Sequence, residues 1–598
     1  MSANRLPSRA ELPRELTWDL EAIYATSEEW ESDFFCLNEA ISKVNSFRGR
    51  LGESAAVLRD AYIASDSLSR LAEKLYVYSH LRADEDTANS VNASREQRIS
   101  AAFAELSAAL AWFEPELTAL SEEQFSLYLQ APELKFYRRT LWELERARKH
   151  ILSAAEERII GMYSDVTGAP GRIYSVLKNA DTVYPKIADA SGKKIELSNG
   201  NYLKFLESAD RKVRKNAFRA MLETQSQVRN TCAATLDATV KRHVVGAKLR
   251  GYNSALEAAL FGDNVPREVY TNLISSVRAN LDGLHSYVKV RSKALDRKKI
   301  DMFDLFAPIV KTAKKEYSWE QAKDLMFKGL EPLGDDYAEL LGKAFSERWV
   351  DVLECRGKRS GAYSSGCYDT YPYLLLNFQN TLNDVFTLAH EFGHSMHSYY
   401  SNQAQEPHYS SYSIFVAEVA STTNEILLQN YLMANAKDPE LKAYLLSHLI
   451  DEIRGTVFRQ TQFAEFELRI HELAEAGVPL TADLLDEEYG KLNADYYGKH
   501  MKQTPLIERE WLRIPHFYYN FYVYKYATGM SAAIQLADGI LSGDPAKLSA
   551  YFGFLKAGSS KDVLDIMRDA GVDLATPAPV EACMRVFKGA VDSLQKLI

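Results

Sequence analysis

Apolar residues recur at three- and four-residue spacing along most of this chain, and this spacing constrains the fold more than any other feature. A representative stretch follows Ser27, a plausible helix N-cap, and contains Trp30, Phe34, Leu37, Ile41 and Val44. Such spacing places the apolar side chains on one face of an α-helix. We therefore expect a mainly helical protein whose helices are separated at glycine and proline.

The helical spacing is lost in two places, where we predict short β elements. Between Thr182 and Leu197, two β-prone runs flank the turn sequence Asp189–Gly192, which predicts a β-hairpin. The run Tyr371–Phe378 also has the character of a strand. It could offer its backbone edge to an extended peptide, or it could lie wholly inside a sheet.

Composition narrows the class of protein. Hydrophobic residues make up 46% of the chain and charged residues 25%, which is typical of a globular protein with a large core. The net charge of -10 argues against a nucleic-acid partner, because binding to phosphates draws on surplus Lys and Arg. The 5 scattered cysteines predict reduced thiols. Without a signal peptide or a membrane-spanning apolar run, we expect a cytoplasmic protein.

The motif His390–His394, which reads His-Glu-Phe-Gly-His, predicts a metal site. On a helix, its two histidines stand one turn apart on the same face and can share one ion. Zinc suits neutral imidazole, and a catalytic zinc takes three protein ligands and leaves a fourth position for water. Glu391 stands beside the first ligand and can take a proton from that water. The pair Asn383-Asp384 offers a helix cap one turn earlier.

A third metal ligand is expected further along the chain. Glu418 is the one charged residue in the helical stretch Phe415–Thr422, and a returning helix would bring it to the metal, although such a residue could also lie at the surface. Glu425 falls on the same face and could orient a ligand histidine through its other ring nitrogen. His397 shares the face of His394, but we expect it to be a structural or surface residue rather than a fourth ligand. We therefore predict one Zn²⁺ per chain.

Three ordered motifs together resemble those of oligoendopeptidase F, among the thimet oligopeptidase-like zinc metallopeptidases. They are His390–His394, Ala417–Thr422 and Ile514–Gly529. The resemblance covers nearly the whole chain and implies a mainly helical, two-lobed clamp around a deep substrate channel, with a small β element next to the zinc helix. It divides the chain into a helical N-terminal region, residues 1–204, ending in the β-hairpin, and a zinc metallopeptidase catalytic region, residues 205–598.

The resemblance also implies a wall for the reaction intermediate. His516, Tyr519 and Tyr526 would hydrogen-bond the tetrahedral intermediate and the substrate backbone, Tyr522 would bind substrate, and Tyr524 is a further competitor for these roles. Donors of this kind suit an oxyanion, which needs stabilisation besides that from the metal. The tyrosines of this segment could equally form an aromatic stripe of the core.

The loop Arg356–Tyr363 matches a glycine-rich loop of this family that closes over substrate. We therefore predict that Gly361, Ala362 and Tyr363 bind substrate, since glycine permits such movement. An ordinary surface turn is the alternative.

The resemblance implies a zinc-dependent endopeptidase that hydrolyses internal bonds of short unfolded peptides, with Glu391 as the general base. A dipeptidyl carboxypeptidase on the same scaffold and a catalytically inert peptide-binding protein are the alternatives. The intact Glu391 beside both histidines disfavours the inert protein. The sequence leaves open the cleavage preference, the physiological peptides, the oligomeric state and the metal used in the cell.

Overall fold

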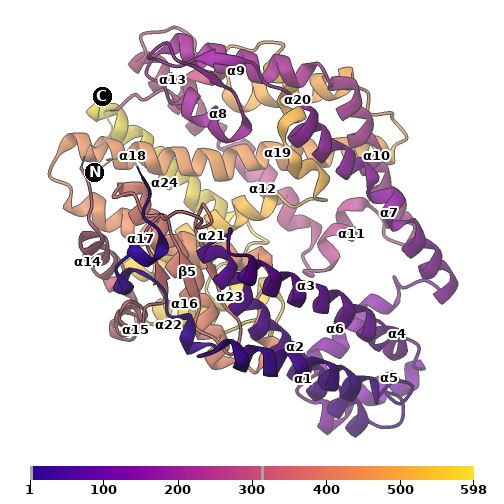
Figure 1. Ribbon diagram of the computed structural model, residues 1–598. Coiled ribbons are helices and arrows are strands. Elements are labelled where there is room, and N and C mark those ends of the chain that lie inside the picture. Colours follow the sequence, from indigo (N-terminus) through magenta and orange to yellow (C-terminus); the bar gives the residue numbers. More distant parts are fainter. Residues whose placement is uncertain (1–4, 311–314) are drawn as a thin grey trace. The chain divides into compact units, whose positions relative to one another are not determined.

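A computed structural model describes residues 5–310 and 315–598. These residues form a mainly helical protein with two small sheets, as the apolar spacing predicts (Figure 1). The chain divides into two compact units, each assembled from separate stretches. Unit 1 comprises Met1–Lys149, Lys315–Asn430 and Leu536–Gly571, and unit 2 comprises His150–Lys314, Tyr431–Gln535 and Val572–Ile598. The predicted division at residue 204 separates two regions of the sequence, not these two compact units, and it stays a prediction.

The N-terminal part of unit 1 is a stack of amphipathic helices. They are α1 (Ser27–Asn45), α2 (Ala55–Glu85), α3 (Ser90–Leu110), α4 (Phe113–Thr118), α5 (Glu122–Gln130) and α6 (Arg138–Arg148). The cap of α1 is Thr26, one residue before the predicted Ser27, and its hydroxyl accepts from the Glu29 N–H at 3.3 Å. Trp30 of α1 is fully buried and donates its indole N–H to the Leu75 carbonyl of α2 at 3.2 Å. The predicted amphipathic face of α1 therefore faces this core.

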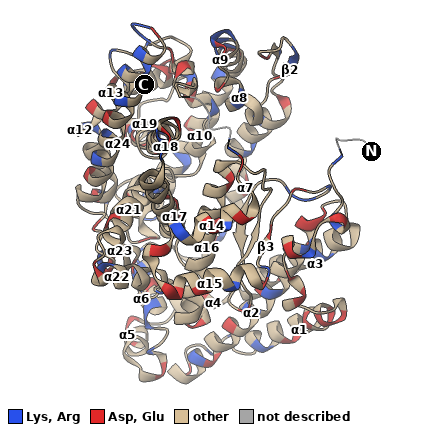
Figure 2. Cartoon of the chain, turned by 90° about the vertical axis from the view of Figure 1, so that its left-hand side faces the viewer, with Lys and Arg blue, Asp and Glu red and all other residues tan. Residues whose placement is uncertain are grey.

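Charged residues of both signs are interspersed along these helices (Figure 2). Arg98 of α3 forms a forked pair with Glu31 of α1, at 2.6 and 2.7 Å. Such exposed pairs contribute at most about 1 kcal/mol each, so the apolar core carries most of the stability.

The rest of unit 1 surrounds a three-stranded sheet. Its elements are α14 (Trp319–Gly329), α15 (Asp335–Ser346), β3 (Val350–Asp351), β4 (Tyr363–Ser365), β5 (Tyr373–Leu375), α16 (Leu382–Ala404), α22 (Pro545–Leu555), α23 (Val563–Asp569) and the part of α17 (Ile414–Asn435) up to Asn430. The strand order is β3-β5-β4, with β5 parallel to β3 and antiparallel to β4.

The strand predicted at Tyr371–Phe378 is β5, and it lies between its two neighbours with all its residues buried. The internal alternative is therefore confirmed, and the expectation that this strand offers a free edge to a peptide is wrong. Among the described strands of this sheet, β4 is the edge strand on the side away from β3.

Unit 2 is also helical. It contains α7 (Ala154–Val176), β1 (Lys186–Ala188), β2 (Lys194–Glu196), α8 (Asn199–Leu206), α9 (Arg211–Ser226), α10 (Arg229–Leu249), α11 (Ala255–Phe261), α12 (Arg267–Ala279), α13 (Leu281–Ala294), α18 (Pro439–Ile453), α19 (Arg459–Glu475), α20 (Ala482–Tyr497) and α24 (Ala578–Leu597), and α21 (Tyr524–Leu541) begins in it. Strands β1 and β2 pair antiparallel, which confirms the predicted hairpin. A π-helical turn, Leu177–Asp181, follows α7 directly.

Two further features concern the cysteines and the apolar character of the helices. All 5 cysteines, which lie among the described residues, are free thiols. No helix in the described ranges joins the length and the apolar character that a bilayer-spanning segment requires.

Candidate active site

Helix α16 carries the His390–His394 motif and begins at a capping box. The Thr381 hydroxyl accepts from the Asp384 N–H at 3.2 Å, and the Asp384 carboxylate accepts from the Thr381 N–H at 2.8 Å. The predicted cap at Asn383-Asp384 therefore lies two residues too late, although Asp384 does contribute to the box.

Gly393, inside the motif, allows α17 to pack directly on α16. A Cβ atom at this position would lie 2.3 Å from the Ser421 Cα and 2.7 Å from the Ala420 carbonyl oxygen. Asn424, fully buried on α17, donates to the Ala389 carbonyl of α16 at 3.1 Å. No role was predicted for this glycine, although a glycine inside a helix is itself a signal of close backbone approach.

This packing brings Glu418 to the two histidines. A Glu418 carboxylate oxygen lies 3.3 Å from Nε2 of His390 and 3.4 Å from Nε2 of His394, and the two Nε2 atoms are 3.2 Å apart. In a tetrahedral zinc site with bonds of about 2.0–2.1 Å, ligand atoms are separated by about 3.3 Å. The nearly equilateral triangle therefore fits three ligands of one zinc ion. Among the described residues, this is the group of His, Cys, Asp and Glu side chains close enough to hold a metal.

Carboxylates surround the His390 ring. Glu425 accepts a hydrogen bond from its Nδ1, as predicted, so its Nε2 is left to face Glu418. Burial lowers the pKa of His390, but the hydrogen bonds to Glu418 and Glu425 outweigh it and raise the pKa to about 10. The same interactions with His390 and His394 lower the pKa of Glu418. The site thus stabilises positive charge at the place where a metal ion would sit.

Glu391 is buried beside this group, with 7% of its surface exposed. Burial raises the pKa of its carboxyl, while the charges of His390 and His394 and the backbone N–H of Ser364 in β4 act in the opposite direction. Ser364 is itself held to α16 by a hydrogen bond of 2.8 Å between its hydroxyl and that of Ser395. Strand β4 therefore lies against the base that the sequence predicts.

His397 is a core residue. The residue is 1% exposed, and its ring stacks on Tyr412 with the ring centroids 3.7 Å apart. Burial lowers its pKa to about 3, so it is neutral. The structural interpretation of this histidine is therefore confirmed.

The first half of the loop Arg356–Tyr363 is anchored. The Lys358 ammonium is fully buried, 2.7 Å from the Asp351 carboxylate, and donates to the Leu353 carbonyl at 2.8 Å. The Gly357 carbonyl accepts from the Thr87 N–H at 2.8 Å. Any loop movement is therefore expected in its second half.

The predicted substrate-binding residues lie in that second half. Gly361 is exposed with φ of +94°, a conformation that favours glycine, and its carbonyl accepts from Asn377 at 2.8 Å. Ala362 is half-buried. Tyr363 donates its hydroxyl to Asp84 at 2.7 Å. Their contact with substrate stays a prediction.

The remaining predicted residues form an aromatic cluster in unit 2. His516 lies 5.6 Å from Tyr519, 6.3 Å from Tyr522 and 6.1 Å from Tyr526, between ring centroids. Tyr524, by contrast, is 1% exposed and packs on Tyr270 in the core. The structure thus separates the competing tyrosines by burial, while the role of each in the reaction stays a prediction.

A buried carboxyl group holds the backbone of this cluster. Glu467 of α19, which is fully buried, accepts from the Phe521 N–H at 2.6 Å. Asn520 and Phe521 both have positive φ, +54° and +60°, which is uncommon for residues with side chains. The hydrogen bond therefore stabilises a strained turn between Tyr519 and Tyr522. No pattern in the sequence predicted this interaction.

Comparison with known proteins places these features in context. Residues 204–586 match the model of peptidase family M3, and residues 116–184 match that of Oligopeptidase F. The chain is 44% identical over 597 residues to Oligopeptidase PepF of Bacillus subtilis, covering 100% of this chain and 89% of the relative. It is 39% identical over 593 residues to the plasmid-encoded Oligoendopeptidase F of Lactococcus lactis subsp. cremoris, covering 99% and 98%.

A solved structure is similar as well. The crystal structure of oligoendopeptidase-F from Enterococcus faecium has a TM-score of 0.74 at 37% identity, and the match covers 95% of this chain and 99% of that one. Sequence and fold therefore agree over nearly the full length of the chain.

Proposed function

Because the chain belongs to peptidase family M3, as an oligoendopeptidase F and hence a metallopeptidase, we propose that it hydrolyses internal bonds of short unfolded peptides with one zinc ion per chain. His390, His394 and Glu418 would hold the ion, and the observation that carries this proposal is their triangle of 3.2–3.4 Å. When bound, zinc would supply a Lewis acid that polarises the scissile carbonyl and lowers the pKa of the attacking water.

The side chains around this group have separate proposed tasks. Glu391 would take the proton of the attacking water and then pass it to the leaving amine. Glu425 would keep the His390 ring oriented and its Nε2 free for the metal. His516, Tyr519 and Tyr526 would donate hydrogen bonds to the oxyanion. That last assignment rests on the resemblance to oligoendopeptidase F.

The edge strand β4 is the proposed site of backbone pairing with the peptide. An extended peptide can add to an exposed sheet edge, and β4 lies against the proposed base. Gly361, Ala362 and Tyr363 at its start would contact the peptide, and Tyr522 would do so from the aromatic cluster. The two-lobed clamp around a deep channel, implied by the resemblance, belongs to the same proposal and would restrict substrates to short peptides.

Product masses test the mode of cleavage. A peptide blocked at its C-terminus should be cut internally, because an endopeptidase requires no free terminus. A dipeptidyl carboxypeptidase would leave it intact and would release dipeptides from the unblocked form. Release of dipeptides alone would therefore refute the endopeptidase assignment.

A further inference from the structure

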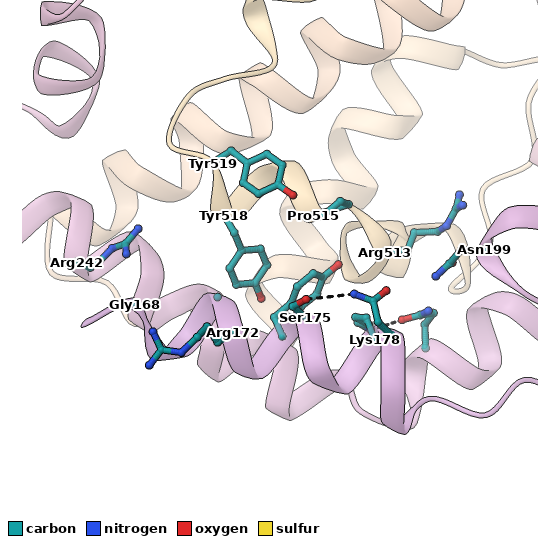
Figure 3. Close-up of a pocket in the computed structure, with 14 residues that line it drawn as sticks. Gly168, Arg172, Ser175, Lys178, Asn199, Arg242, Arg513, Pro515, Tyr518 and Tyr519 are labelled. Atoms are coloured by element: carbon teal, nitrogen blue, oxygen red, sulfur yellow. Dashed lines mark hydrogen bonds between the residues drawn. The ribbon is translucent and has the colours of Figure 1, made fainter. Parts of the chain in front are cut away.

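Unit 2 contains a pocket beside the aromatic cluster, and of its described lining residues the proposed chemistry uses Tyr519 alone. Its volume is about 520 Å³, within the range of small-ligand sites. Figure 3 shows Arg172, Ser175 and Lys178 on the helical ribbon of one wall and Pro515, Tyr518 and Tyr519 on the facing segment. Tyr519 takes part in both places, since it also contacts His516 in the cluster.

The charges of this pocket have one sign. Its described lining residues include the cationic side chains of Arg172, Lys178, Arg242 and Arg513 and no carboxylate. Among the described residues, Arg172 forms an ion pair with the exposed Asp165, which does not line the pocket, at 3.0 Å, and the Arg242 guanidinium lies 3.2 Å from the His243 ring. The pocket therefore has the electrostatic character of a site for an anion.

Lys178 is the most informative of these residues. The residue is 6% exposed. Its ammonium donates a hydrogen bond to the Gln225 side chain and lies 5.5 Å from the centroid of the Tyr174 ring. Within the described ranges it forms no ion pair with a carboxylate. A buried ammonium without a counter-ion is unfavourable, and an anion in the pocket would remove that cost.

The backbone at Lys178 is unusual too. The residue lies in the π-helical turn Leu177–Asp181, and such turns are rare and occur frequently at functional sites. The facing segment packs on this wall, because Tyr518 stacks on Tyr174 with the ring centroids 4.2 Å apart and its hydroxyl lies 2.9 Å from that of Thr235. Both walls thus hold a preformed cavity.

We propose that this pocket binds a carboxylate of the peptide substrate, with Lys178 as the buried counter-charge and Arg172 and Arg242 as exposed ones. The inference rests on the proposed peptidase function, because Pro515, Tyr518 and Tyr519 flank His516, which that function places against the peptide. The carboxylate is the C-terminal group of the peptide or an acidic side chain. In either case the pocket would bind a peptide that carries this carboxylate more tightly than a peptide that lacks it.

Peptide binding to the zinc-loaded Glu391→Gln variant tests the proposal separately from catalysis. Fluorescence anisotropy would compare a labelled peptide acid with its C-terminal amide, and an amidated peptide carrying one Asp with its Asn counterpart. We expect about 10-fold tighter binding of the acidic member in at least one pair. Adding Lys178→Met should reduce this preference to less than about 2-fold, with the neutral peptide bound as before.

Matched variants keep the test decisive. Lys248→Met removes an exposed lysine of α10 that does not line the pocket and should leave the preference intact. The double variant Arg172→Gln/Arg242→Gln alters only exposed side chains and should weaken the preference even if the Lys178 variant fails to fold. Equal binding within both pairs, or a preference that survives the pocket variants, would overturn the proposal. If the wild type hydrolysed peptides but showed no preference for acidic ones, only the assignment of the pocket would be overturned. If acidic peptides bound more tightly but the wild type hydrolysed none, only the proposed function would be overturned.

Discussion

Replacement of Gly393 by alanine should disrupt the metal centre without touching a ligand. The added Cβ would lie 2.3 Å from the Ser421 Cα and 2.7 Å from both the Ala420 oxygen and the Ser421 nitrogen. All three are backbone atoms of α17, so no side chain can rotate away. Helices α16 and α17 would have to separate by about 1 Å to restore an ordinary contact.

That separation can be converted into two expected effects. Overpacking of a well-packed interface typically costs about 1–3 kcal/mol, and three backbone clashes place this variant at the upper end. Glu418 lies one turn before Ser421, so it moves with that turn. Because metal–ligand distances tolerate only about 0.2 Å, we expect at least a ~10-fold loss of zinc affinity.

Zinc affinity, measured by competition with a chromogenic chelator, and thermal unfolding would check both effects. Gly553→Ala in α22 is the matched control, because that exposed helical glycine has nothing within 4 Å of the added Cβ. Alanine there should leave zinc affinity unchanged and add up to about 1 kcal/mol of stability. If Gly393→Ala bound zinc as the wild type does, the argument from close helix packing would be refuted.

Two further predictions concern the carboxyl groups of Glu425 and Glu467. Glu425→Gln should lower zinc affinity by about 10–100-fold with little change in stability, since it weakens the hydrogen bond that orients His390; unchanged affinity in the chelator assay would contradict this. Burial raises the pKa of Glu467 to about 8 in the folded protein. Between about pH 4.5 and 8 this carboxyl therefore ionises in the unfolded state but not in the folded state, so the free energy of unfolding of the wild type should fall as the pH rises through this range. Glu467→Gln keeps a side-chain oxygen that accepts from Phe521, and it should remove the loss of stability that ionisation of Glu467 causes. The measurement is the urea midpoint of both proteins across this pH range. If the midpoints of the two proteins changed equally with pH, the prediction would be refuted.

Much of the fold was predictable because its signals are local. The apolar spacing of α1 reports a buried face that the structure confirms around Trp30. The His390–His394 motif lies on one helix, so its geometry follows from helical periodicity alone. Glu425 was found for the same reason, as it shares a helix face with Glu418.

The features that escaped prediction depend on partners distant in sequence. Whether β5 is internal depends on its pairing with both β3 and β4. The separation of Tyr524 from Tyr522 depends on the packing of Tyr524 against Tyr270 of α12. Lys178 carries no motif, and the lack of a carboxylate partner for it among the described residues depends on the packing of α7, α9 and the segment after Arg513.

In the proposed mechanism, Glu391 would activate water beside a zinc ion that His390, His394 and Glu418 would hold. Its most direct test is the rate at which the Glu391→Gln variant hydrolyses an internally quenched peptide, normalised to bound zinc. We predict one zinc per chain, as in the wild type, and a rate at least about 100-fold lower, the smallest effect typical of a lost general base. Hydrolysis at the wild-type rate by the zinc-loaded variant would contradict the claim.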